Sequence, residues 1–238
     1  MSKIQNADLK KMKGVSERDQ KMIADAETLL GPEPSEMGVV KNFFWGNLRE
    51  ELLFPYPQMD KVSADERREC DELVAKLKVY LKEEHPAVEI DQEQYIPEWV
   101  IKKLFDMGVL GMTIPKSHGG LGMGITSYNR VLETLGTRCG STAVMVSAHQ
   151  SIGCKAVMLY GTDEQKERWL PKLAREWLSA FCLSEPQVGS DAGGQETTIR
   201  LSDDGEHYII NGEKKWATSG AISGLFTVMG KQMIDGKE

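Results

Sequence analysis

The chain of 238 residues is long enough for one large domain or two small ones, and its 40% hydrophobic and 27% charged residues are ordinary for a globular protein. Its net charge of -7 argues against nucleic-acid binding, which requires a basic face. No apolar run approaches the roughly 18 residues of a membrane-spanning helix. The N-terminal segment lacks the apolar core of a secretory signal and is too acidic for a transit peptide, so we predict a cytoplasmic protein without a transmembrane segment.

The cysteines and histidines do not suggest a metal or redox site. The four cysteines match neither a zinc spacing nor a CxxC motif, which predicts free thiols in a reducing compartment. These cysteines are Cys70, Cys139, Cys154 and Cys182. No pair of histidines has metal-ligand spacing, and His149, in a segment of small residues, is predicted to be a packed and hydrogen-bonded histidine.

The N-terminal part of the chain divides into two stretches. Residues 1–37 are polar and contain a Gly-Pro-Glu-Pro sequence, which predicts a flexible arm. Residues 39–57 are rich in aromatic side chains that need cover from water, so we expect this stretch to pack as a strap on the domain that follows.

Residues 38–176 show apolar side chains at helical spacing, which predicts an all-α domain. Ser63 and Glu66 form a capping-box pattern at the start of a helix of about five turns. The residues predicted to line its buried face are Cys70, Leu73, Val74, Leu77 and Leu81.

Four further helices are predicted in chain order. One begins at Pro97 and is ended by Gly108, and one runs from about Thr126 to Leu135. The small residues of 141–160 predict a central helix that packs closely against its neighbours and ends at Gly161. A second capping box, Thr162–Gln165, begins a short helix that reaches about Leu173.

Residues 177–238 change to strand-like patterns, which predicts the opening strands of a β-barrel-like domain and an α+β fold overall. Asn211-Gly212 follows an apolar run, which predicts a type I′ hairpin there. The predicted strands are Leu178–Ser184, Glu196–Leu201, Tyr208–Ile210, Lys215–Thr218 and Leu225–Met229. The acidic run at residues 203–206 is interpreted as a solvated hairpin tip.

Two segments of this second part have the residues of a ligand site. In Phe181–Asp191 an apolar strand runs into a turn, where consecutive backbone N–H groups and Gly189 allow close approach of a ligand, and Ser190 offers a hydroxyl. Trp216, 25 residues after Asp191, offers a flat apolar wall for a ring. The alternatives are a turn capped by Ser190 or Asp191, and a tryptophan packed in the sheet core.

The glycines of Gly120–Gly124 do not have the spacing, or the preceding strand, of a dinucleotide-binding loop. We interpret this segment as a loop between helices that needs positive φ angles.

Together these segments resemble the flavin-binding signature of the acyl-CoA dehydrogenases. Further resemblances to that family follow in the family's order at Ile114–Gly122, His149–Gly153 and Gly161–Leu173. The resemblance covers residues 72–231 and is nearest to the long-chain and very-long-chain branch, as Phe54–Pro57 and Leu225–Val228 also indicate.

The resemblance implies an FAD site, and it implies that Ser190 also lies near the entrance for the acyl-CoA substrate. The residues assigned to FAD are Phe181, Cys182, Leu183, Ser184, Gly189, Ser190, Trp216, Ala217 and Thr218. The implied reaction is the α,β-dehydrogenation of long-chain acyl-CoA thioesters in fatty acid β-oxidation. Electrons then pass to an electron-transferring flavoprotein, and the complete protein is expected to be a homodimer or homotetramer.

The family's catalytic base is a glutamate on a C-terminal helical bundle, which the resemblance places beyond Glu238. We therefore expect a fragment without this bundle, one that binds FAD weakly and turns over no substrate, and we assign no catalytic residue. Two alternatives remain open, namely a non-catalytic assembly or scaffold protein with the same fold and a related acyl-CoA oxidase.

Overall fold

The computed structural model describes residues 39–44, 46, 48–54 and 62–233, in two compact units that are separated near residue 60. The first unit contains the short helix α3 (Val39–Phe44) and a 3-10 turn at Glu50–Leu52. The predicted arm at residues 1–37 lies outside the described residues. The aromatic strap stays a prediction.

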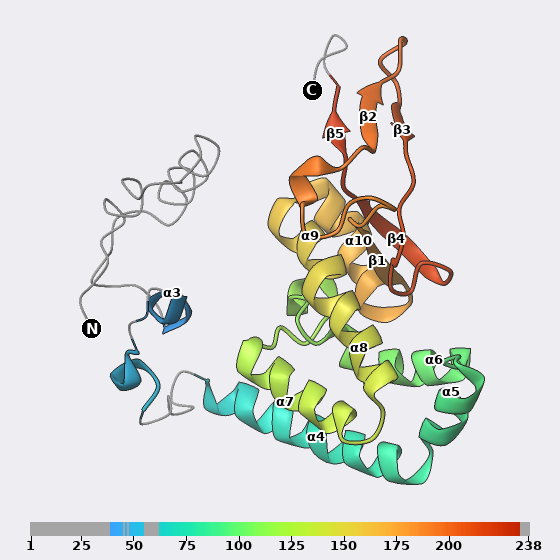
Figure 1. Cartoon of the computed structure of the whole chain (residues 1–238). Helices are drawn as coiled ribbons and strands as arrows, with labels where there is room; N and C mark the ends of the chain where they lie inside the picture. Colours follow the sequence, from blue (N-terminus) through green and yellow to red (C-terminus); the bar gives the residue numbers. More distant parts are fainter. Residues whose placement is uncertain (1–38, 45, 47, 55–61, 234–238) are drawn as a thin grey trace. The chain divides into compact units, whose positions relative to one another are not determined.

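The second unit begins with a helical part, which confirms the predicted α-helical fold of this part of the chain (Figure 1). Its helices are α4 (Ala64–Glu83), α5 (Ala87–Glu93), α6 (Glu98–Asp106), α7 (Ile125–Gly136), α8 (Gly140–Ala148), α9 (Cys154–Tyr160) and α10 (Asp163–Arg175). Between them lie the 3-10 turns η3 (Val109–Gly111) and η4 (Lys116–His118) and the π-helical turn η5 (His149–Gly153).

The start of α4 differs in one respect from the predicted capping box. Ser63 caps the helix as expected, because its hydroxyl accepts a hydrogen bond from the Glu66 backbone N–H at 3.1 Å. The Glu66 carboxylate does not return to Ser63. It accepts from the Gly124 backbone N–H at 2.9 Å and the Ser127 hydroxyl at 2.6 Å, and so caps the first turn of α7. The Glu66 side chain, predicted to bond within its own helix, instead connects α4 to α7.

The predicted buried faces of the helices form the main core. The predicted apolar residues of α4 are all buried, and they lie in one cluster with buried residues of α6, α7 and α8. Pro97 is the residue before α6 and not its first residue, whereas Gly108 follows the helix with a φ of 79°, as predicted for its end. The apolar spacing of residues 126–135 also predicts a buried Leu132, which is half-buried in α7.

The glycine-rich loop is a packing element. The backbone N–H groups of residues 119–122 all donate to backbone carbonyls of residues 111–116. A Cβ atom on Gly120 would overlap the Ile114 carbonyl, and Gly119 and Gly122 have φ angles of 84° and 65°. These glycines allow two backbone segments to approach closely and allow positive φ angles, which confirms the interpretation as a loop between helices.

The predicted central helix is interrupted. Residues 140–160 form α8 and α9 joined by the π-helical turn η5, and Gly161 ends the helix as predicted. The π-helical turn is one residue wider than an α-helical turn. It directs the side chains of both His149 and Gln150 into the interior, where each is fully buried. The second capping box is confirmed, since Thr162 and Gln165 exchange hydrogen bonds at 2.9 and 3.2 Å.

The strands form two small sheets. β1 (Leu178–Cys182) pairs in parallel with β4 (Ser223–Val228), while β2 (Thr198–Leu201) lies between antiparallel β3 (Tyr208–Asn211) and parallel β5 (Lys231–Gln232). In Figure 1, β1 and β4 lie beside α9 and α10, and the β2–β3 hairpin extends away from the helices. A second apolar cluster, which includes Leu173 and partly buried Leu225, joins these helices to β4.

Two predictions for the strands are wrong. Asn211-Gly212 is not a hairpin tip, because the β2–β3 hairpin closes at residues 202–207 and Ser202 N–H donates to the His207 carbonyl at 2.7 Å. Lys215–Thr218 is not a strand, and Trp216 has a φ of 62° that no strand residue adopts. The exposed acidic run at 203–206 forms the hairpin tip, as predicted.

The four cysteines are free and buried, which confirms the prediction of unpaired thiols. Among the described residues, no helix combines the length and apolar character needed to cross a bilayer.

Candidate functional site

The two segments singled out in the sequence lie side by side. The Lys215 backbone N–H donates to the Ser184 carbonyl at 2.8 Å, and the Lys215 ammonium donates to the Pro186 carbonyl at 3.0 Å. The Lys214 ammonium donates to the Leu183 carbonyl at 3.0 Å. The turn after β1 and the segment that leads to Trp216 are therefore parts of one site.

A buried ion pair holds these two segments together. The Lys214 ammonium lies 2.6 Å from the Glu185 carboxylate, and only 11% and 3% of the two side chains are exposed. The carboxylate also accepts from the backbone N–H groups of Glu196 at 2.5 Å and Thr197 at 3.0 Å. Since each charge is paired and hydrogen-bonded, removal of one partner would leave the other buried without compensation.

The electrostatics of Glu185 follow from these contacts. The Lys214 ammonium, then Thr197 and the backbone N–H groups of Glu196 and Thr197, lower the pKa of this carboxyl to about 2. Burial opposes this shift and is outweighed. Glu185 therefore stays ionised at neutral pH and acts as a permanent link within the site.

Sequence reasoning did not identify Glu185 and Lys214. The available signals were weak, namely a carboxylate directly after an apolar strand and a lysine two positions before Trp216. The two residues are 29 positions apart, and their pairing depends on how the chain returns to β1.

The nine predicted FAD residues lie around the end of β1 and in the neighbouring segment. Cys182 is buried in β1, and burial raises the pKa of its thiol. The half-buried residues of the set are Phe181, Leu183, Ser184 and Ala217. The exposed residues of the set are Gly189, Ser190, Trp216 and Thr218.

Neither alternative interpretation of these segments fits the structure. Trp216 is 84% exposed, so it is not a core residue of the sheet. Within the described residues, the side chains of Ser190 and Asp191 make no hydrogen bond, so neither caps the turn. The turn is instead closed by backbone hydrogen bonds between Glu185 and Val188 at 2.9 and 3.2 Å. The Ser190 hydroxyl and the Trp216 ring are accessible to a ligand.

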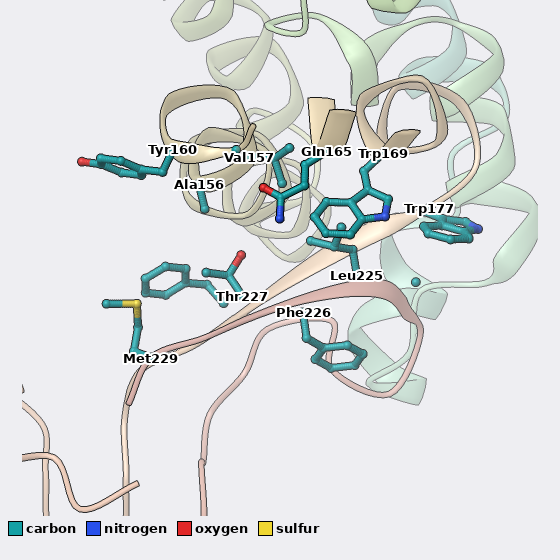
Figure 2. Close-up of a pocket in the computed structure, with 13 residues that line it drawn as sticks. Ala156, Val157, Tyr160, Gln165, Trp169, Trp177, Leu225, Phe226, Thr227 and Met229 are labelled. Atoms are coloured by element: carbon teal, nitrogen blue, oxygen red, sulfur yellow. The ribbon is translucent and has the colours of Figure 1, made fainter. Parts of the chain in front are cut away.

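A groove of about 670 Å³ lies beside the site, between α9 and α10 and the sheet of β1 and β4. Figure 2 shows Val157 and Trp169 on the helix side, opposite Leu225 and Thr227 of β4, while Phe226 points to the other side of the strand. Among the nine predicted residues, Phe181 lines the groove. Sequence reasoning missed this groove, since its walls come from elements that are distant in the chain.

The comparisons with known proteins agree with this arrangement. Residues 67–176 match the model of the acyl-CoA dehydrogenase N-terminal domain, and residues 180–238 match that of the middle domain. The mitochondrial very long-chain specific acyl-CoA dehydrogenase of Bos taurus is 36% identical over 192 residues, which are 80% of this chain and 29% of the relative. The probable acyl-CoA dehydrogenase FadE10 of Mycobacterium tuberculosis is 38% identical over 192 residues, with the same two shares.

A solved structure leads to the same family. The acyl-CoA dehydrogenase of Bacillus anthracis, complexed with FAD, superposes with a TM-score of 0.65 at 33% identity and covers 75% of this chain and 30% of that one. The chain belongs to the acyl-CoA dehydrogenase family. It spans about a third of the length of the relatives that it matches.

Proposed function

We propose that the site formed by residues 181–190 and 214–218 holds FAD, and that the protein dehydrogenates long-chain acyl-CoA thioesters between the α and β carbons. The observation that carries this proposal is the junction of the two segments by Lys214 and Lys215 at Leu183 and Ser184. The relatives support the reaction class, since the names of two of them specify acyl-CoA dehydrogenases, one of them for very long chains.

The residues of the site fit this cofactor. The half-buried Ser184 at the end of β1 would hold the polar edge of the ring system, and Trp216 would lie against the ring face. Apart from its two chain neighbours, no described residue has an atom within 4 Å of a Cβ built on Gly189, which leaves room for a phosphate close to the backbone. The free hydroxyl of Ser190 would bind a pyrophosphate oxygen, and Thr218 would donate to the ring.

The division of the chemistry follows from these positions. When bound, FAD supplies the acceptor for the hydride that leaves the β carbon. The chain would orient the cofactor through Ser184 and Trp216, and the acyl-CoA substrate would enter near Ser190. We assign the carboxylate that takes the α proton to no residue of this chain.

The finer points of the function are further parts of the proposal. We infer a preference for long acyl chains, electron transfer to an electron-transferring flavoprotein, and a homodimer or homotetramer as the working assembly. The cytoplasmic location stays a prediction from the sequence, and the Bos taurus relative is named as mitochondrial.

The test is the visible spectrum of the purified complete protein, translated from the full-length reading frame, before and after anaerobic addition of palmitoyl-CoA. We expect an oxidised-flavin band that bleaches. A yellow protein that does not bleach would retain the FAD site and favour the scaffold function. A colourless protein that does not take up added FAD would overturn the assignment. Bleaching followed by rapid return in air with peroxide would favour an oxidase.

A further inference from the structure

His149 connects four elements through one buried ring. Its Nδ1 lies 3.1 Å from the Ser179 backbone nitrogen in β1, and its Nε2 lies 3.0 Å from the carbonyl oxygens of Leu110 and of Leu173. A backbone N–H can only donate, so Nδ1 accepts and the ring proton must be on Nε2, where it is shared between the two carbonyls. The ring is thus fixed in one tautomer between η5, β1, η3 and α10.

The π-helical turn makes this contact possible. It directs Gln150 inward beside His149, where the Gln150 amide oxygen accepts from the Thr113 N–H at 3.0 Å and the Thr113 hydroxyl at 2.5 Å. The Gln150 amide also donates to the Leu110 carbonyl. A Cβ on Gly153 would overlap the Ser179 hydroxyl, so glycine lets the turn touch the strand. π-helical turns of this kind are frequent at functional sites.

The strand that His149 contacts is the strand that leads to the proposed FAD site. Ser179 is followed on β1 by Phe181, on the same face of the strand, and then by Leu183 and Ser184. A strand is stiff over this distance, so the hydrogen bond at Ser179 sets where Phe181 lies relative to the helices. Because β1 ends at Cys182, it also sets where the segment to Ser184 begins.

We propose that His149 is a positioning residue for β1, the strand that leads to the proposed FAD site. Its Nδ1 accepts the hydrogen bond from the Ser179 N–H and thereby fixes where residues 181–184 lie relative to the helices. A test of this role by FAD affinity rests on the proposed function. The role itself concerns the strand and is measurable without the cofactor.

Two substitutions separate the two sides of the ring. In His149→Asn, the amide oxygen takes the place of Nδ1 and can accept from Ser179, but the link to Leu110 and Leu173 is lost. In His149→Gln, the amide nitrogen takes the place of Nε2 and keeps the link to the carbonyls, but the Ser179 backbone N–H loses its acceptor. The Ser179 hydroxyl keeps its hydrogen bond to the backbone carbonyl of residue 149. A merely structural histidine would tolerate or reject both changes alike.

The matched control is His85→Gln. His85 is the other buried histidine of the helical part, 4% exposed, and its Nε2 pairs with the Thr142 hydroxyl at 3.1 Å without contact to β1. We expect His149→Gln to weaken FAD binding about tenfold, or about 1.4 kcal/mol, while His149→Asn and His85→Gln stay within about twofold of the parent chain. Equal losses in His149→Asn and His149→Gln, or a tenfold loss in His85→Gln, would overturn the proposal.

Amide hydrogen exchange without FAD gives the second measurement. We expect faster exchange at residues 178–182 in His149→Gln, and parent-like exchange there in His149→Asn and His85→Gln. If the parent chain does not bind FAD, the proposed function fails, and exchange in β1 still decides the role of His149. His149→Asn is decisive even if His149→Gln does not fold, since a folded His149→Asn with fast exchange in β1 would contradict the positioning role.

Discussion

The helices and the strands of the second unit are stabilised in different ways. Helices α4, α6, α7 and α8 share a continuous apolar cluster in which residues such as Leu77, Leu104 and Leu135 are fully buried. The strands bury less, and all four residues of β3 are exposed. Near the proposed site, the apolar cluster that joins α9 and α10 to β4 is supplemented by a small number of buried polar contacts, with Glu185, Lys214 and His149 as the main groups.

We infer from this difference that the helices provide most of the folding stability, whereas the strands provide the proposed binding site. Loss of a core side chain in the helices should lower global stability, because apolar burial is the dominant favourable term in folding. Loss of a polar contact at the strands should act first on the binding site, because these contacts decide where the two segments lie. The following predictions test this division.

The largest effect is expected from Leu104→Ala in α6. Leu104 is fully buried, and its truncation should cost about 2–5 kcal/mol of unfolding free energy. Chemical denaturation measures this loss. The control is Leu159→Ala in α9, where the side chain is 63% exposed and the change should stay within about 0.5 kcal/mol. FAD affinity of the folded fraction should be retained in Leu104→Ala, and a tenfold loss there would contradict the division.

Acid should weaken the molecule through His149. Burial lowers the pKa of His149 from 6.5 to about 4, and the hydrogen bonds to the carbonyls of Leu173 and Leu110 oppose this shift only in part. The unfolded chain binds the proton first, so stability is complete above pH 6.5 and falls by up to about 1.4 kcal/mol per pH unit toward pH 4.

Denaturation at a series of pH values measures this slope. His149→Asn should flatten this slope between pH 6.5 and 4. Burial also lowers the pKa of His85, so a smaller slope should persist. Glu185 adds a second loss in the same direction at lower pH, between 4.5 and about 2, as its carboxylate becomes protonated. An unchanged slope in His149→Asn would show that another group titrates.

Lys214→Met should weaken FAD binding more than tenfold, about 1.4 kcal/mol or more, because Glu185 is left buried without its partner. Flavin fluorescence titration measures the affinity. The double variant Lys214→Met with Glu185→Leu should recover part of the loss, since no unpaired charge remains. Lys102→Met is the control, as Lys102 forms an exposed ion pair with Asp106. Equal affinities in Lys214→Met and Lys102→Met would refute the role of the pair.

The smallest effect is expected from Trp216→Ala. An aromatic contact with the ring system is worth about 0.5–1.5 kcal/mol beyond area burial, which corresponds to a loss of about two- to tenfold in FAD affinity. Trp99→Ala is the matched control, because Trp99 is 48% exposed on α6. Thermal unfolding should change little in either variant. A Trp216→Ala protein with parent affinity would remove Trp216 from the proposed site.

The sequence was a reliable guide where local rules decide the structure. The buried face of α4, the cap at Ser63, the second capping box and the glycine after α6 follow from spacing and from backbone groups within a few residues. It was a poor guide where the partner is far away. The partner of the Glu66 carboxylate and the position of the hairpin both depend on contacts between residues that are distant in the sequence, and no local pattern predicts such contacts.

By itself, the sequence determined the succession of helices and most of the strands, since apolar periodicity, caps and turn residues act over a few positions. Its resemblance to the acyl-CoA dehydrogenases singled out the two segments of the proposed flavin site. Only the tertiary structure decided the π-helical turn, the pairing of Glu185 with Lys214 and the contact of His149 with β1. The two side-chain contacts join residues about 30 positions apart, and their energy comes from burial that exists only once the chain has closed around them.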